Sequence, residues 1–238
     1  MREPLLIIKN ITHEGPGLLE VLLWEYGIAF HCEDLSRGGT FPDPRDYRAV
    51  VVLGGPQSAN DTTPVMHLQL LQIERALHES IPFLGICLGM QMLVKAGGGT
   101  VIKCQMKETG FLDSQGNPYR IELTSAGKKE PLFAGLGNSF PVFQLHEETV
   151  ELAATGMELL ATGKNCPIQA VKVGKNAYGL QCHFEMTPPM FSEWCTIDAD
   201  LKGMDHHNLM EQFDTLQKEY TSTGRMLMDN FLRIASLV

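Results

Sequence analysis

The chain has 238 residues, and its 19 Lys and Arg against 28 Asp and Glu give a formal net charge of -9 at pH 7. An acidic chain is a poor ligand for nucleic acid, because a phosphate backbone is bound through clustered Lys and Arg. Hydrophobic residues make up 44% of the chain and charged residues 20%, which is typical of a folded protein and excludes a disordered one. Since no low-complexity linker interrupts it, we expect a single domain over residues 1–238.

The start of the chain indicates neither a secretory signal nor a membrane anchor. The apolar run Leu5–Ile8 is too short for a signal, and Glu3 places an acid where signals avoid one. The most apolar stretch, residues 81–90, ends at Gln91 and falls well short of the ~20 residues that span a bilayer. We therefore expect a cytoplasmic protein with no membrane partner.

Cysteine and histidine spacing predicts no metal site. In a chain without a signal, the six cysteines are expected to be reduced thiols; they are at positions 32, 87, 104, 166, 182 and 195. No Cys-x-x-Cys pair occurs, which disfavours zinc. His206 and His207 are adjacent on an expected helix and cannot face one ion together. We expect neither a metal nor another cofactor.

The first part of the chain alternates between strand-like and helix-like segments. Strands are expected at residues 5–8, 49–53 and 82–86, and helices at 17–29 and 64–79. The strands are apolar without alternation, as parallel strands buried on both faces are. This order predicts an α/β fold with a mostly parallel central sheet and helices on both faces.

The second expected helix has clear end signals and an apolar stripe. Thr63 and the residues before it offer caps, and Pro64 suits the first turn. Helical spacing predicts that Leu68, Leu71, Ala76 and Leu77 form its buried stripe.

After residue 97 the pattern changes to short strands between turns, followed by a helical tail. Residues 168–173 and 177–182 flank Gly174-Lys175-Asn176, which predicts a hairpin. Further short strands are expected at 100–102, 119–123, 140–144 and 158–161. The catalytic core is thus expected over about 5–190, with a helical extension over about 191–238. The apolar stripe of this extension either covers its own sheet, which helices with this period usually do, or offers a docking face to a partner.

The stretch from Phe83 to Gln91 carries the strongest chemical signal. A buried strand runs into Gly-x-Cys-x-Gly and then into a helix, the cysteine counterpart of a strained elbow that presents a nucleophile above a sheet. Gly85 and Gly89 lack the Cβ atoms that would collide in such a turn. At the helix N-terminus Cys87 would be favoured as the nucleophilic thiolate. A small buried cysteine with no reactivity is the alternative.

Two further segments support the reactive interpretation of Cys87. Gly54-Gly55-Pro56-Gln57-Ser58 follows a buried strand, where a glycine-rich turn can aim a backbone N–H at a neighbouring site. His183 and Glu185 follow another strand, and such a pair allows the histidine to act as base while the carboxylate holds its ring in one tautomer.

These segments together resemble the class I (triad) glutamine amidotransferase family. The matching motifs are Gly-x-Cys-x-Gly-x-Gln at 85–91, Gly-Gly-Pro-x-Ser at 54–58 and His-x-Glu at 183–185. Weaker matches are residues 144–150, similar to the family's Ser-His-x-Asp-x-Val segment, and residues 108–111, similar to its Glu-x-Gly turn. Among relatives the layout looks most like stand-alone proteins similar to the amidotransferase domain of guanosine monophosphate synthase. The resemblance implies a flavodoxin-like amidotransferase fold.

The resemblance also implies roles for individual residues. Cys87 would attack the side-chain amide of glutamine, His183 would act as base and acid, and Glu185 would orient His183. The backbone N–H groups of Gly55 and Leu88 would form the oxyanion hole. The expected contacts to the rest of the substrate come from four residues: Gln91, Gln144, Leu145 and His146.

Three positions depart from the family pattern. Phe184 stands where the family usually has Pro, and Cys182 stands where Phe is common. Either change could tilt the loop that carries His183. Leu145 replaces the usual Ser and could still act through its backbone.

Three functions remain open from the sequence, and a resemblance to the protease and chaperone family with the same elbow ranks behind them, because Leu88 stands where that family usually has His after the nucleophile. The first is a glutaminase that supplies ammonia to a separate synthetase chain, because this chain lacks the phosphate-binding loops with which it could activate an acceptor itself. The second is a γ-glutamyl peptidase or hydrolase with the same triad and water as final acceptor. The third is a catalytically silent binding module. The intact Cys87, His183 and Glu185 argue against it, because such a module has no physical need for all three.

Overall fold

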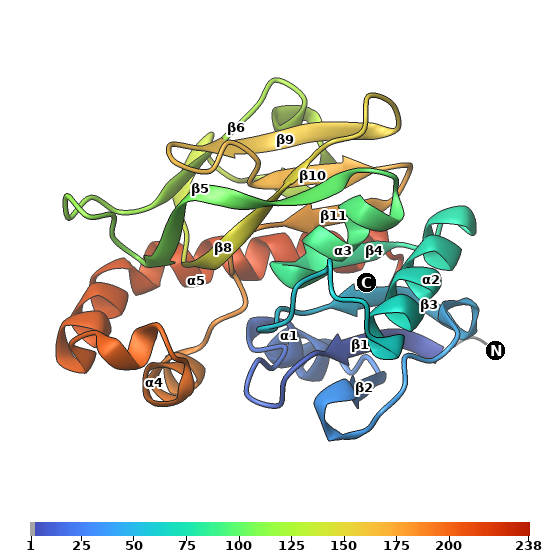
Figure 1. Ribbon diagram of the computed structural model, residues 1–238, viewed down its shortest axis with the longest axis horizontal. Helices are drawn as coiled ribbons and strands as arrows, with labels where there is room; N and C mark the ends of the chain where they lie inside the picture. Colours follow the sequence, from blue (N-terminus) through green and yellow to red (C-terminus); the bar gives the residue numbers. More distant parts are fainter. Residues whose placement is uncertain (1–2) are drawn as a thin grey trace.

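A nine-stranded sheet organises the molecule, in the order β2-β1-β3-β4-β11-β10-β9-β6-β7 (Figure 1). The structure is a computed structural model that describes residues 3–238. Met1 and Arg2, which precede the apolar run considered above as a signal, lie outside the described residues. The first five strands in this order pair in parallel and the remaining four pair antiparallel. The strands are β1 Glu3–Lys9, β2 Phe30–Asp34, β3 Tyr47–Val52, β4 Phe83–Ile86, β6 Arg120–Leu123, β7 Ser139–Pro141, β9 Met157–Gly163, β10 Ala170–Val173 and β11 Ala177–Leu180.

Helices cover both faces of this sheet because its central strands are apolar on both sides. Leu5 and Ile7 of β1 pack on one face with leucines of α1 (Leu18–Tyr26) and with α5 (His206–Ile234). Leu6 and Ile8 point to the other face, which α2 (Pro64–His78) and α3 (Leu88–Ala96) cover. The expected α/β fold with a mostly parallel sheet is therefore confirmed.

The buried face of α2 differs from the expected one. Thr63 caps the helix by accepting a hydrogen bond from the Met66 N–H at 3.2 Å, as expected. However, Leu68 and Leu71 are 36% and 44% exposed. Ala76 is buried and Leu77 partly buried, as expected. The other buried positions are Met66, Gln69, Gln72 and Ile73. Gln72 can face inward because its amide donates to the carbonyl of Phe41 at 3.2 Å.

Some strands after α3 are longer than expected, and one expected strand is divided into two. The hairpin of β10 and β11 around residues 174–176 is confirmed. The expected strand over 140–144 is two strands, β7 and β8 (Gln144–Glu151), and β8 pairs with β5 (Thr100–Gly110) in a separate two-stranded sheet. The register of that pair shifts between Lys103 and Glu108. β2 escaped prediction because its side chains are only partly buried and mostly polar.

The helical extension covers its own sheet. α4 (Pro188–Ile197) contributes to a third apolar cluster, and Leu227, Met228, Phe231 and Leu232 of α5 pack in the cluster that holds the leucines of α1. Figure 1 shows α5, in red, running along the sheet. No helix within residues 3–238 combines the length and apolarity that a membrane crossing requires.

The middle of α5 also holds the loop after β11. The hydroxyl of Tyr220 donates to the carbonyl of His183 at 3.0 Å and accepts from the Met186 N–H at 3.3 Å. Gly224 lies so close that a Cβ atom there would meet the Phe184 carbonyl oxygen at 2.3 Å. This segment of α5 therefore fixes the backbone on which His183 is placed.

Candidate active site

Cys87 lies in a strained turn between β4 and α3. Its φ and ψ of 52° and -109° are unusual for a residue with a side chain, and it is the N-cap of α3. A Cβ atom on Gly85 would meet the Gly89 carbonyl oxygen at 2.4 Å, and one on Gly89 would meet that of Val52 at 2.1 Å. The two flanking glycines are thus required by the close approach of backbone across the elbow and to β3.

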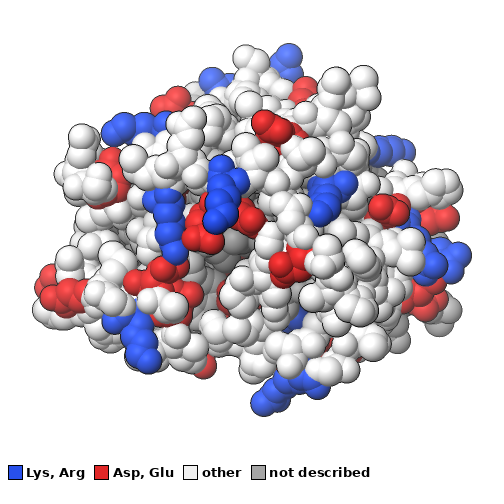
Figure 2. Space-filling view, viewed as in Figure 1, with Lys and Arg blue, Asp and Glu red and all other residues white. Residues whose placement is uncertain are grey.

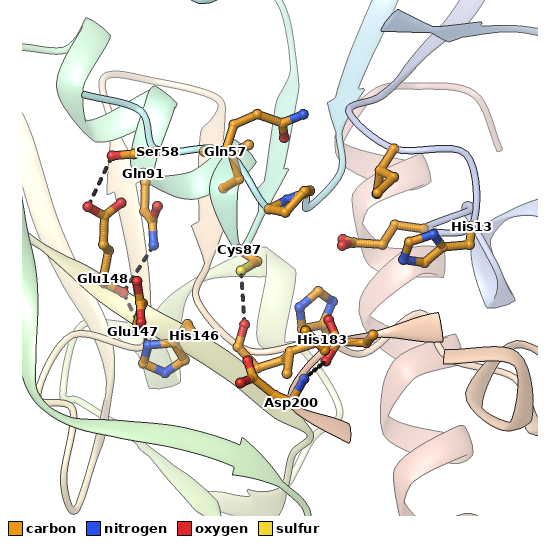
Figure 3. Close-up of a pocket in the computed structure, with 18 of the residues that line it drawn as sticks. His13, Gln57, Ser58, Cys87, Gln91, His146, Glu147, Glu148, His183 and Asp200 are labelled. Atoms are coloured by element: carbon orange, nitrogen blue, oxygen red, sulfur yellow. Dashed lines mark hydrogen bonds between the residues drawn. The ribbon is translucent and has the colours of Figure 1, made fainter. Parts of the chain in front are cut away.

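His183 and Glu185 form a buried pair beside this turn. Nδ1 of His183 lies 2.6 Å from Oε1 of Glu185, and both side chains are almost fully buried. Burial opposes the imidazolium, but the Glu185 carboxylate and a hydrogen bond to Cys87 outweigh it and raise the pKa of His183 well above its usual value. The structure thus brings together the three residues of the expected triad; Figure 3 shows two of them, Cys87 and His183, at the cavity.

The departure at Phe184 adds a hydrogen bond to the pair. The backbone N–H of Phe184 donates to the second carboxylate oxygen of Glu185 at 2.9 Å, which a proline could not do because it has no N–H. The ring of Phe184 is buried against Phe140, with ring centroids 5.8 Å apart. The loop is therefore not displaced from the Glu185 contact, and Cys182 is simply buried.

The sulfur of Cys87 faces a cavity of about 520 Å³. The expected oxyanion residues Gly55 and Leu88 both line it. Leu88 is the first residue of α3, so its N–H is among those that a helix leaves without an internal acceptor. Gln57 donates to the carbonyl of Asn10 at 3.1 Å, which holds the glycine-rich loop on the end of β1.

The expected substrate-binding residues are not all in the cavity wall. Leu145 and His146 line it, and the carbonyl of Leu145 accepts a hydrogen bond from the Cys87 thiol at 3.7 Å. Gln91 also lines it, although its amide already donates to the carbonyl of Glu148 at 3.0 Å. Gln144 is outside the lining and its side chain is buried. A contact between the substrate and the backbone around Gln144 stays a prediction.

Sequence reasoning missed Glu14, which lies next to the triad. It lines the cavity, and a Cβ atom on Gly54 would meet its Oε2 at 2.2 Å and the Cε1 of His183 at 3.1 Å. Burial raises the pKa of Glu14 to about 7, against the opposing effect of His183. Its position directly after β1, at the carboxyl end of a parallel strand, is the signal that could have indicated it.

The helical extension contributes a ring contact to His183 and one partner of a salt bridge in the cavity wall. The ring of Trp194 on α4 lies edge-on to that of His183 with centroids 5.2 Å apart. Lys107 of β5 forms a salt bridge of 2.6 Å with Asp200, and both residues line the cavity. Over the face shown in Figure 2, acidic and basic side chains are interspersed rather than gathered by sign.

A second group of cysteine and histidine side chains lies around β5 and β8. Cys104, His146 and Cys166 have ligand atoms that all lie within 4.8 Å of one another. Among the described residues this is the group of three that could hold a metal ion. Spacing could not indicate it, because its members come from three separate segments.

Comparisons with known sequences place the chain in a family. The model of the glutamine amidotransferase class-I family matches residues 33–193. The glutamine amidotransferase-like protein YfeJ of Salmonella typhimurium is 32% identical over 184 residues, covering 75% of this chain and 70% of that protein. The glutamine-hydrolysing GMP synthase of Thermosipho melanesiensis is 33% identical over 145 residues. That match covers 60% of this chain but only 25% of the synthase.

Solved structures agree with this assignment. The crystal structure of a glutamine amidotransferase from Thermotoga maritima has a TM-score of 0.84 and 28% identity, and 99% of each chain is covered. A glutamine amidotransferase from Methylobacillus flagellatus has a TM-score of 0.82 and 25% identity, with 98% of this chain and 96% of that chain covered. The elbow, the buried histidine and the global fold therefore lead to one conclusion: the chain belongs to the class I glutamine amidotransferase family.

Proposed function

We propose that this protein hydrolyses the side-chain amide of glutamine through a γ-glutamyl thioester on Cys87. The observation that carries the proposal is the arrangement of Cys87 on a strained helix N-terminus and of a His183, lining the same cavity, that the Glu185 carboxylate holds at Nδ1. Nucleophile, base and orienting group then follow one another within hydrogen-bond reach.

The first half-reaction forms the thioester. The Cys87 thiolate, which a protonated His183 favours, attacks the amide carbon of the substrate. The oxygen of that amide becomes an oxyanion, which the N–H groups of Leu88 and Gly55 would stabilise; one such donor is commonly worth about 10²–10³ in rate. His183 gives its proton to the leaving nitrogen, the C–N bond breaks, and ammonia leaves.

The second half-reaction returns the enzyme to its starting state. His183, now neutral, takes a proton from water, and the hydroxide attacks the thioester carbon. The C–S bond breaks, glutamate leaves, and the Cys87 thiolate again faces a protonated His183. Glu185 keeps the ring in one orientation during both proton transfers, assisted by the Phe184 N–H.

A γ-glutamyl conjugate is the second candidate substrate. The cavity of about 520 Å³ falls within the range of about 300–1,000 Å³ typical of pockets for ligands of drug size. Residues 197–200 contribute to its wall, and they lie beyond the range that the family model matches. A wall that extends beyond the matched family core favours a substrate that extends past the glutamyl group.

Transfer of the ammonia to a separate synthetase chain is the other branch of the proposal. The GMP synthases among the relatives are glutamine-hydrolysing enzymes about four times as long as the segment they share with this chain. A glutaminase coupled to such a partner gains nothing from releasing ammonia alone. We therefore expect slow glutamine hydrolysis by the isolated chain, with either stimulation by a partner or a preference for a γ-glutamyl conjugate.

The test is ammonia or amine release from glutamine and from a panel of γ-glutamyl compounds. Cys87→Ala should abolish release of either product, while Cys32→Ser, at an exposed cysteine outside the site, should leave it unchanged. Release at the wild-type rate by a folded Cys87→Ala variant would overturn the mechanism. Fast hydrolysis of glutamine with no preference for larger substrates would indicate a plain glutaminase.

A further inference from the structure

The cluster of Cys104, His146 and Cys166 has the composition of a zinc site. Cys104 lies where the register of β5 and β8 shifts, His146 lies on β8, and Cys166 lies in the turn before β10. Sγ of Cys104 is 3.4 Å from Nδ1 of His146, and the three potential ligand atoms lie within 4.8 Å of one another. Soft sulfur and imidazole donors favour zinc over the oxygen-seeking Mg²⁺ and Ca²⁺.

We propose that the protein binds one zinc ion through the Sγ atoms of Cys104 and Cys166 and Nδ1 of His146. Zn–S and Zn–N bonds are about 2.3 and 2.0–2.1 Å long. Around a tetrahedral ion these lengths place sulfur and nitrogen roughly 3.5 Å apart, which agrees with the 3.4 Å separation of Cys104 and His146. Water takes the fourth position, which zinc sites with three protein ligands keep open.

The surroundings of His146 match those of a zinc-binding histidine. Its Nε2 lies 3.0 Å from the buried carboxylate of Glu108, and Gln169 donates to the same carboxylate oxygen at 3.2 Å. A carboxylate that accepts from one ring N–H leaves the other nitrogen with its lone pair free to bind the metal. Glu108 therefore acts as a positioning residue rather than as a ligand.

Nδ1 of His146 has a second polar neighbour besides Cys104. Nδ1 of His146 also lies 3.1 Å from the carbonyl oxygen of Glu148. When Nε2 carries the proton toward Glu108, this oxygen faces a lone pair on Nδ1. A cation bound at Nδ1 would screen that repulsion. The hydroxyl of Thr149, 3.2 Å from Sγ of Cys166, can donate to the thiolate.

The position of the cluster indicates what the ion does. Cys104 is half-buried and gives access from solvent, while Cys166 and His146 are buried. His146 and Glu148 belong to the wall of the active-site cavity. A zinc ion there would join β5, β8 and the turn before β10, and so stiffen this wall without contacting the atoms that react.

Cobalt is the probe for this site, because Co²⁺ in a tetrahedral site with thiolate ligands absorbs strongly. We would titrate the metal-free full chain with Co²⁺ in a phosphine reductant, expecting one equivalent to bind with a sulfur-to-cobalt charge-transfer band that Zn²⁺ removes. Cys104→Ser and Cys166→Ser should abolish the band. The matched controls Cys32→Ser and Cys87→Ala should retain it. Glu108→Gln should weaken the binding by roughly 10–100-fold.

A second measurement on the unaltered chain covers the case in which a variant fails to fold. Alkylation followed by peptide mass analysis should show that Zn²⁺ protects Cys104 and Cys166 but leaves Cys32 reactive. The proposal is overturned if no band forms, if it survives both cluster variants, or if it disappears in Cys87→Ala, which would place the metal in the active site. A thiol pair that oxidises to a disulfide and binds no Co²⁺ when reduced would overturn it as well.

Discussion

Two histidines of this molecule have similar neighbours but face different surroundings. His183 has Glu185 at 2.6 Å from Nδ1 and the Cys87 thiol on its other side. His146 has Glu108 at 3.0 Å from Nε2 and the sulfur of Cys104 at 3.4 Å from Nδ1. In both, a buried carboxylate fixes the ring while the second nitrogen is directed at sulfur.

The difference lies in the sulfur. Cys87 is a single thiol on strained backbone at a helix N-terminus, and it faces the cavity. Cys104 stands beside a second thiol, Cys166, and both come from ordinary strand and turn segments. One isolated sulfur in front of a histidine suits nucleophilic attack, whereas two sulfurs around a histidine suit metal coordination. The carboxylate–histidine pair alone therefore does not indicate which chemistry follows.

Replacing each histidine by asparagine is the strongest way to break this comparison. His183→Asn should lower kcat/KM for amide hydrolysis by roughly 10⁴-fold or more, because the members of a triad act as a unit. His146→Asn should abolish cobalt binding and change KM more than kcat, since His146 lines the cavity but does not contact the sulfur of Cys87. Equal losses of kcat in the two variants would remove the distinction between them.

Replacing each of the two carboxylates by an amide sharpens the comparison. Glu185→Gln should lower kcat by about 10²–10⁴-fold, less than the loss of His183, because an amide neither stabilises the imidazolium nor holds the correct tautomer. Glu108→Gln should act mainly on cobalt affinity. Steady-state kinetics and metal titration on the same two preparations would decide this, and wild-type kcat in Glu185→Gln would show that another group orients His183.

Glu14 provides a pH test, because it lies beside His183 and has no counterpart at His146. Its carboxyl has a pKa of about 7 in the folded protein and 4.5 in the unfolded chain. The stability that this group contributes below pH 4.5 is therefore lost as pH rises through about 7, by an amount on the order of 3 kcal/mol. Urea denaturation should show Glu14→Gln to be more stable than wild type at pH 8 and nearly equal to it at pH 4.5. A difference in unfolding free energy between the two proteins that is the same at all pH values would contradict this expectation.

The smallest expected effect concerns the N–H of Phe184. Phe184→Pro removes the donor to Glu185, while Phe184→Leu keeps this donor and loses only the ring. Because a hydrogen bond to a charged group is worth about 1.5–3 kcal/mol, kcat of Phe184→Pro should be roughly 10-fold or more below that of Phe184→Leu. Equal kcat values, with both variants folded by circular dichroism, would show that the Nδ1 contact to Glu185 suffices.

Local patterns were predictable from the sequence, and groups assembled from distant segments were not. The elbow at Cys87 and the pair His183 and Glu185 each lie within a few residues, so the sequence could indicate them. The assembly around His146 depends on the register shift between β5 and β8, which no local pattern specifies. Leu68 and Leu71 were wrongly expected to be buried. The orientation of α2 on the sheet decides which of its faces is buried, and no local pattern specifies that orientation.

The contact between α5 and the loop after β11 bears on how the protein is made. The hydroxyl that holds the carbonyl of His183 belongs to Tyr220, which follows it by 37 residues. A ribosome therefore releases the elbow and the catalytic histidine before it releases the helix that fixes them in position. The nascent chain therefore contains Cys87 and His183 before the hydrogen bond that holds the His183 carbonyl can form. Under the proposed mechanism, amide hydrolysis would begin only after α5 has docked.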